Sequence, residues 1–219
     1  MFPEPKRLEI DHRTIKFLVG VIALSLATLA SLLSGPPPIE SVSASYHEGG
    51  LARDVFVGSL FAIAAFLAAY NGMSRRELVL SKVAAVAALL VAVFPCGCGT
   101  HVEAVRYVHA GSAAIMFGVL VLFCFTFRGR ALAKGHPQAK MRAATYALCG
   151  GVIALSIAVI ALDYALGGKI SSSVPRLTFY GENVALVAFG IAWLSASRVL
   201  PLISSEEERF SPFTSREGC

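Results

Sequence analysis

Charged residues are scarce in this sequence: only 15% of its 219 residues are Asp, Glu, Lys or Arg, against about 25% in soluble domains. The hydrophobic fraction is 56% and the mean hydropathy is +0.68. This composition argues against an ordinary water-soluble domain and indicates a chain that is solvated by a lipid bilayer. We expect one membrane domain at residues 17–198, with polar tails at residues 1–16 and 199–219.

Cysteine is also scarce, and its five residues are scattered, which argues against a framework of disulfides. The sequence has no Walker, Rossmann, nucleophile-elbow or H-E-x-x-H motif, so the common nucleotide and hydrolytic sites are not predicted. The net charge of +5 comes without a basic stripe interleaved with aromatic residues. Nucleic acid is therefore not an expected partner, whereas membrane lipids are.

Six nearly uncharged runs follow one another along the chain, each close to the ~20 residues that cross a bilayer core as a helix. They comprise residues 17–39, 55–74, 83–100, 108–127, 143–162 and 177–197. The runs are apolar on every face and lack the alternation of a barrel strand, so helices are favoured. The predicted fold is all-α, an integral membrane bundle of six transmembrane helices. The first run exceeds a signal-peptide core and is predicted to be a retained span.

Lysine and arginine are distributed unevenly between alternate connections. Most of them lie in the two tails and in the connections at residues 71–82 and 128–142. By the positive-inside rule these segments are cytoplasmic, so we expect both termini in the cytoplasm and a multi-pass protein of the cell inner membrane. The C-terminal tail is expected to be disordered.

Ionisable residues gather at the other, non-cytoplasmic ends of the predicted helices. Asp54 opens the second helix, His109 lies near the start of the fourth, and Glu182 lies about one turn inside the sixth. Such groups are costly within a span and normally face a partner inside the bundle. We therefore hypothesise an outer-leaflet polar pocket that binds or processes a lipid or other amphiphile. Glu182, His109 and Asp54 are its candidate catalytic residues, and Arg106 and His101 its candidate substrate-binding residues.

The same residues are compatible with a metal-dependent hydrolase, in which a carboxylate, an imidazole or a metal activates water. His109, His101 and Asp54 are candidate metal ligands, and Cys96 and Cys98 could add two thiolates. Such a set suits a divalent metal such as zinc. The cysteine pair could alternatively cycle as a disulfide. Whether the protein is an enzyme stays open at this point.

A non-catalytic reading is the alternative: a membrane scaffold or lipid-binding protein whose polar residues only lock helix ends together. In this reading Glu182 pairs with Arg106 or Arg176, and Asp54 caps its helix. Transport is disfavoured because no charged residue lies at mid-membrane.

Short motifs between residues 53 and 194 resemble a known group of proteins. They are RDVFVG from Arg53, Phe94-Pro95, a histidine opening a span, and Gly181-Glu182-Asn183 before ALVAFGIAWL. The order of these motifs resembles uncharacterised bacterial multi-span proteins of the domain of unknown function 998 kind. It is distantly similar to the Frag/DRAM/Sfk group of six-span proteins, some of which are associated with lipid remodelling. The resemblance implies a bundle of about six spans and no established activity, and the Cys-Gly-Cys insertion is not part of the pattern.

Overall fold

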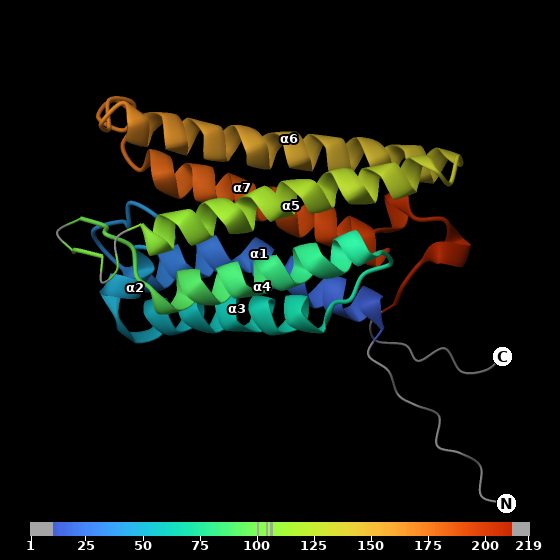
Figure 1. Ribbon diagram of the computed structural model, residues 1–219, viewed down its shortest axis with the longest axis horizontal. Helices are drawn as coiled ribbons and strands as arrows, with labels where there is room; N and C mark the ends of the chain where they lie inside the picture. Colours follow the sequence, from blue (N-terminus) through green and yellow to red (C-terminus); the bar gives the residue numbers. More distant parts are fainter. Residues whose placement is uncertain (1–10, 100, 104, 106, 212–219) are drawn as a thin grey trace, which may run out of the picture.

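The computed structural model describes residues 11–99, 101–103, 105 and 107–211, which form helices and loops with no strand among them (Figure 1). The predicted all-α class is thus confirmed. The α-helices are α1 (His12–Ser34), α2 (Ser45–Glu48), α3 (Gly50–Ala69), α4 (Arg75–Val93), α5 (Val108–Leu132), α6 (Pro137–Ala165) and α7 (Leu177–Ser197). Two short 3₁₀ helices follow, η1 (Pro201–Ile203) and η2 (Glu206–Glu208).

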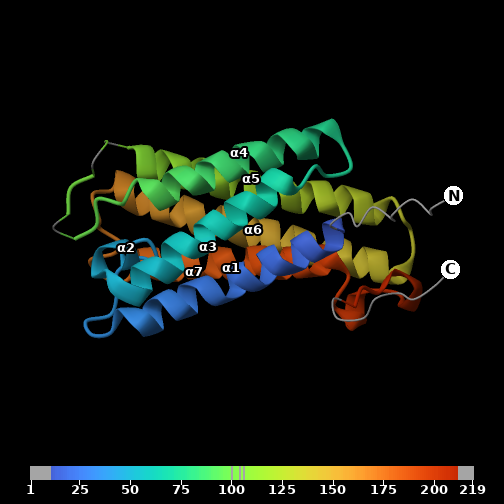
Figure 2. The same cartoon turned by 90° about the horizontal axis from the view of Figure 1, so that it is seen from below.

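The six long helices form a closed ring in which each packs against its neighbours in chain order. The ring closes where α7 packs along α1 (Figures 1 and 2). Aromatic rings fill its interior, and the indole of Trp193 lies 5.7 Å from the Phe123 ring and 5.3 Å from the Phe189 ring. Small residues bring the helices close: a Cβ added at Gly190 in α7 would lie 2.9 Å from the Gly20 carbonyl oxygen of α1. Such close approach is how helices associate in lipid.

Five of these helices, α1, α3, α5, α6 and α7, are long and apolar enough to cross a membrane. The helix α4 differs because four of its first eight residues are charged. Its bounds also differ from the predicted run at residues 83–100. The helix begins earlier, where the Ser74 hydroxyl accepts the Glu77 N–H at 3.2 Å as an N-cap. It ends at Val93, because Phe94 precedes a proline and takes an extended conformation.

Within the described residues, the segments that flank the predicted membrane domain are more ordered than the sequence indicated. The first helix starts at His12, before the expected boundary at residue 17, and the Asp11 carboxylate caps it by accepting the Arg13 N–H at 3.0 Å. Residues 199–211, here called the C-terminal strap, were expected to be disordered but fold against the bundle. The fully buried Arg142 needs acceptors, and its Nη1 donates to the Ile203 carbonyl at 2.6 Å. The strap supplies that acceptor.

Candidate functional site

The loops at residues 35–49, 94–107 and 166–176 gather at one end of the ring, here called the disulfide end. Two predicted catalytic residues, Glu182 and His109, both line a small cavity of about 30 Å³ at this end. Apolar side chains of α1, α3, α4, α5 and α7 form most of its wall. A cavity of this volume holds about one or two water molecules. It is too small for a lipid headgroup.

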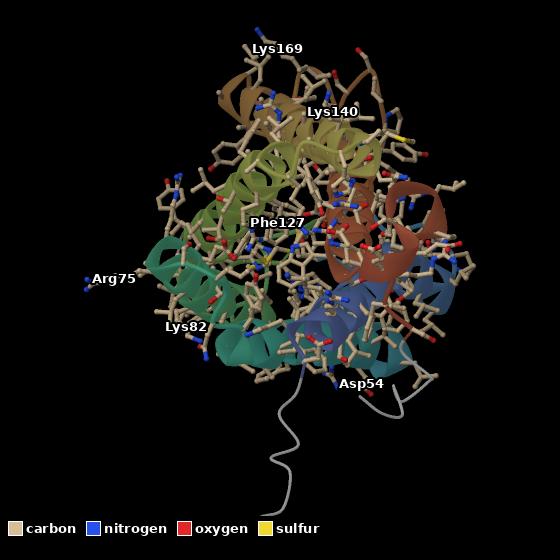
Figure 3. The ribbon with its side chains drawn as sticks, turned by 90° about the vertical axis from the view of Figure 1, so that its right-hand side faces the viewer. Asp54, Arg75, Lys82, Phe127, Lys140 and Lys169 are labelled. Carbon is tan, nitrogen blue, oxygen red and sulfur yellow. A yellow bond between two sulfur atoms is a disulfide. The ribbon has the colours of Figure 1, made fainter. Side chains whose placement is uncertain are left out.

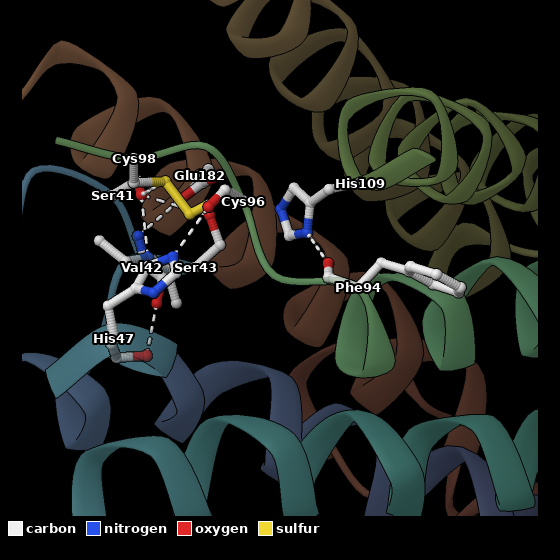
Figure 4. The surroundings of a disulfide bond; sticks show 11 residues. Ser41, Val42, Ser43, His47, Phe94, Cys96, Cys98, His109 and Glu182 are labelled. Atoms are coloured by element: carbon white, nitrogen blue, oxygen red, sulfur yellow. Dashed lines mark hydrogen bonds between the residues drawn. A yellow bond between two sulfur atoms is a disulfide. The ribbon is translucent and has the colours of Figure 1, made fainter. Parts of the chain in front are cut away.

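Glu182 fastens the loop at residues 35–49 to α7. Its Oε2 accepts the Val42 N–H at 2.6 Å (Figure 4). Beside it, Arg176 Nε donates to the Ile39 carbonyl oxygen at 2.8 Å. The two side chains therefore bind neighbouring main-chain groups of the same loop. Asp163 does the same for the loop at residues 166–176, since its Oδ1 accepts two backbone N–H groups of that loop, at 2.8 and 3.0 Å.

His109 fastens the end of α4 to the start of α5. It is buried, and its Nδ1 lies 2.7 Å from the Phe94 carbonyl oxygen (Figure 4). Because a carbonyl only accepts, Nδ1 carries the proton in this contact. The ring is thereby held in one tautomer by a main-chain partner. This hydrogen bond is the kind expected of a side chain that holds two helix ends together.

Cys96 and Cys98 form a disulfide at the rim of this end (Figure 4). The Cys96 carbonyl oxygen lies 2.8 Å from His47 Nε2, and the His47 ring stacks on His101 with 4.0 Å between ring centroids. The two sulfur atoms are bonded to each other, so neither cysteine offers the thiolate that it could have added to a metal site. Within the described chain, no three His, Cys, Asp or Glu side chains form a group that could hold a metal ion.

Asp54 is not part of the group. Its side chain is 64% exposed, it lies 3.7 Å from Arg53 Nε, and it does not line the small cavity. Nor does it cap α3, whose N-cap is Gly49. Arg106, the predicted substrate-binding residue, lies outside the described residues. Of the predicted site residues, the structure thus brings Glu182 and His109 together and leaves Asp54 apart.

The opposite end of the ring, here called the basic end, holds a cavity of about 500 Å³ that the sequence did not predict. Its wall comes from α1, α5, α6, α7, the turn after α3 and the C-terminal strap (Figure 3 views this end, with Phe127 inside the ring). Five cationic side chains and two carboxylates line it. The cations are Arg13, Lys16, Arg130, Lys134 and Arg198, and the carboxylates are Asp11 and Glu208.

Lys16 is the most unusual of these cations because it is only 7% exposed. Its Nζ lies 5.2 Å from the ring centroid of Tyr70 and 5.4 Å from that of Phe127. Among the described residues, no hydrogen-bond acceptor and no ion-paired carboxylate contacts this ammonium. Burial of an ammonium is costly unless an anion accompanies it. The aromatic faces compensate for only part of that cost.

The nearby carboxylate of Glu77 is already occupied. It is 1% exposed, it accepts the Tyr70 hydroxyl at 2.9 Å and the Met73 N–H at 3.2 Å, and it pairs with Arg130 Nη1 at 3.1 Å. Glu77 therefore compensates Arg130 and holds Tyr70 in place. It makes no direct contact with Lys16.

Glu208 in the strap has several basic partners at the mouth of the cavity. Its carboxylate pairs with Lys134, with Arg142 at 2.9 Å and with Arg198 at 3.6 Å. Partial burial alone would raise the pKa of this carboxyl, but the hydrogen bond from Lys134 and the charge of Arg142 lower the pKa below its ordinary value. The strap therefore presents a stable anion to the basic end.

Comparisons of the chain with protein-family models, curated proteins and solved structures found no match. The fold and composition define its class: an all-helical, multi-pass membrane protein. The sequence did not predict the basic-end cavity, because the lysines and arginines at that end have the distribution of orientation signals. One signal was present, since His12 and Lys16 are four residues apart and Arg13 and Lys16 three, which places them on one helix face.

Proposed function

We propose that all six long helices cross the cell inner membrane, with the basic end and both termini in the cytoplasm. The helix α4 packs between α3 and α5 along the ring, and its 19 residues span about 28 Å at 1.5 Å each. The start of α1 and the end of α7 lie at the same end, as an even number of crossings requires. The excess of lysine and arginine at that end supports the cytoplasmic assignment.

We propose that this membrane protein binds a phosphate-bearing ligand in the basic-end cavity and performs no covalent chemistry on it. The ligand is either the headgroup of a membrane lipid or a small phosphorylated compound. The observation that carries the proposal is the buried ammonium of Lys16, which lines the cavity, has aromatic rings as its direct contacts and interacts with the carboxylates of Glu77 and Asp11 only as more distant charges. An anion in the cavity would supply a direct counter-charge.

The chemistry of the cavity wall favours phosphate. Phosphate oxygens are acceptors that several lysine and arginine donors share, as charge-assisted hydrogen bonds. Five such side chains converge on the cavity, against two carboxylates. Its volume, about 500 Å³, lies in the range of small-molecule sites. The rings of Tyr70, Phe127 and Tyr146 give the non-phosphate part of the ligand an apolar wall.

The disulfide end is proposed to be structural, in agreement with the non-catalytic reading of its residues. Glu182 and His109 each bind a main-chain group of another segment, and the cavity between them is sized for water. A lipid that reached these residues would have to displace the loops that they hold. The basic-end cavity, at about 500 Å³, already has the volume for such a ligand.

The test uses the Lys16→Met variant, which keeps the length of the side chain and removes the charge. Binding of inorganic phosphate, pyrophosphate and glycerol 3-phosphate is measured by calorimetry on protein in neutral detergent. Binding of phosphatidylglycerol against phosphatidylcholine is measured in nanodiscs. We expect wild-type protein to bind either the free phosphate compounds or phosphatidylglycerol. Lys16→Met should bind the same ligand roughly ten- to a hundredfold more weakly, because a charge-assisted contact is lost.

Stability separates a binding role for Lys16 from a structural one. Replacing an uncompensated buried charge by an apolar side chain is neutral or stabilising, so the melting temperature of Lys16→Met should equal or exceed that of wild type. The matched control is Lys140→Met, an exposed lysine that does not line the cavity (Figure 3). It should bind as wild type does. Wild-type protein that binds neither the free phosphates nor the anionic lipid, or Lys16→Met that binds them equally well, contradicts the proposal.

A further inference from the structure

The C-terminal strap contributes its own anion to the basic-end cavity. Glu208 lines the cavity, and its carboxylate contacts Lys134, Arg142 and Arg198. These are side chains of the turn after α5, of α6 and of the residue after α7, so one carboxylate joins three separate parts of the bundle. Two of the three, Lys134 and Arg198, also line the cavity.

The contacts that hold the strap are polar: hydrogen bonds add to the ion pairs of Glu208. Arg142 donates to the Ile203 carbonyl at 2.6 Å, Arg13 Nη1 donates to the Glu208 carbonyl at 3.3 Å, and the Phe210 N–H donates to the Arg198 carbonyl at 3.1 Å. Neither η1 nor η2 contains a buried residue. Elements held by few buried apolar contacts open at low free energy. The strap is thus the part of the cavity wall best suited to move.

From this arrangement, and on the basis of the proposed function, we infer that Glu208 is a built-in competitor of the phosphate-bearing ligand. In the ligand-free protein its carboxylate neutralises the cations at the cavity mouth. A ligand phosphate takes over Lys134 and Arg198, and the strap is released. One anion replaces another at Lys134 and Arg198, whereas the buried Arg142, which does not line the cavity, loses its strap acceptors and opposes the release.

This exchange also defines which ligands bind well. Glu208 brings a single negative charge, so a ligand that brings one charge, such as a phosphodiester, gains little by displacing it. A phosphomonoester or a pyrophosphate carries more charge and more acceptor oxygens. The strap therefore selects for terminal phosphate groups. Among membrane lipids, phosphatidic acid is favoured over phosphatidylglycerol on this basis.

The experiment compares wild type with Glu208→Gln, which removes the charge and keeps the size of the side chain. Glu207→Gln is the matched control, because Glu207 is exposed and does not line the cavity. Affinities for pyrophosphate and glycerol 3-phosphate are measured by calorimetry, and those for phosphatidic acid and phosphatidylglycerol in nanodiscs. A docked strap that outnumbers the released strap by about ten to one lowers the apparent affinity of wild type about tenfold. Glu208→Gln removes this competition, so we expect it to bind roughly tenfold more tightly than wild type. Glu207→Gln should match wild type.

Hydrogen exchange of the strap peptide in wild-type protein gives a second readout that needs no variant. Saturating ligand should raise exchange at residues 199–211 and leave the disulfide end unchanged. Equal affinities of wild type and Glu208→Gln, or a strap that stays protected at saturation, overturn the competitor role while the proposed binding function stands. Absence of binding in every protein overturns the proposed function itself.

Discussion

The two ends of this helical ring both bury ionisable side chains, and they use them differently. At the disulfide end, Glu182, His109 and Asp163 each bind main-chain groups of a neighbouring loop or helix end, and Glu182 and His109 line a cavity of about 30 Å³. At the basic end, charged side chains face one another around about 500 Å³, and Lys16 has no described carboxylate in direct contact. A buried charge therefore does not by itself mark a binding site. Its partners and the free volume beside it do.

Physical chemistry explains why the two arrangements differ. A loop at the end of a membrane bundle has backbone groups that must be satisfied, and a buried carboxylate or imidazole satisfies them at fixed geometry. Such a side chain is held in place by the main-chain group that it binds. Cations around an open volume instead repel one another, and an anion relieves that repulsion. The first arrangement stabilises the fold, whereas the second is the one that we propose for ligand binding.

The largest effect that we predict is that of Glu77→Ala at the basic end. This change leaves Arg130, the Tyr70 hydroxyl and the Met73 N–H without their shared acceptor. Loss of one partner from a buried pair costs about 3–5 kcal/mol. The free energy of unfolding in detergent, measured by denaturant titration, should fall by about that amount. Glu77→Gln is the control, since it keeps hydrogen-bonding atoms and should lose less. Equal, small losses for both variants would mean that the charge cluster contributes little to the fold.

A smaller effect is expected from Glu182→Ala at the disulfide end. The buried Val42 N–H loses its acceptor, which costs about 1–3 kcal/mol. Phosphate or lipid binding at the basic end should not change. Asp54→Asn is the matched control at the same end, because its exposed side chain should alter stability by less than about 0.5 kcal/mol. Thermal unfolding and calorimetry on the same samples test both statements. If Glu182→Ala lost ligand binding while its stability stayed unchanged, the ligand-binding site would lie at the disulfide end instead.

Much of this fold could be predicted from the sequence, because apolar runs of bilayer length leave the helix as the main solution. The bounds of α4 could not, since a cap at Ser74 draws charged residues into a helix that hydropathy begins later. The meeting of Glu182 and His109 followed from their common end of the bundle. That Asp54 lies apart from their cavity could not be predicted, because hydropathy gives the depth of a residue and not the helix face on which it lies.

The strap and the basic cavity were beyond sequence reasoning for a related cause. A segment rich in serine and glutamate has the composition of a disordered tail. Its order depends on cations that are distant in the chain, of which Arg142 is fully buried and bonded to Ile203. Lys16 likewise becomes unusual only when the ring places it beside Tyr70 and Phe127, from two other elements. Long-range charge pairing of this kind leaves no local pattern.

The smallest effect that we predict is an acid-dependent loss of stability at the basic end. Because the folded protein lowers the pKa of Glu208, its carboxylate stabilises the fold fully above the ordinary value of 4.5. That contribution is lost as the pH falls below 4.5 through the lowered pKa. Melting temperatures of wild type and Glu208→Gln, measured from pH 7 to pH 3, should differ at neutral pH by about 2–4 °C and converge in acid. Other carboxylates are present in both proteins, so the difference between the two curves reports Glu208 and its contacts with Lys134, His136, Arg142 and Arg198. A constant difference across the whole range would show that the Glu208 charge does not hold the strap. The disulfide end does not contribute to this difference in melting temperature, because its loops are held in both proteins by the same main-chain bonds.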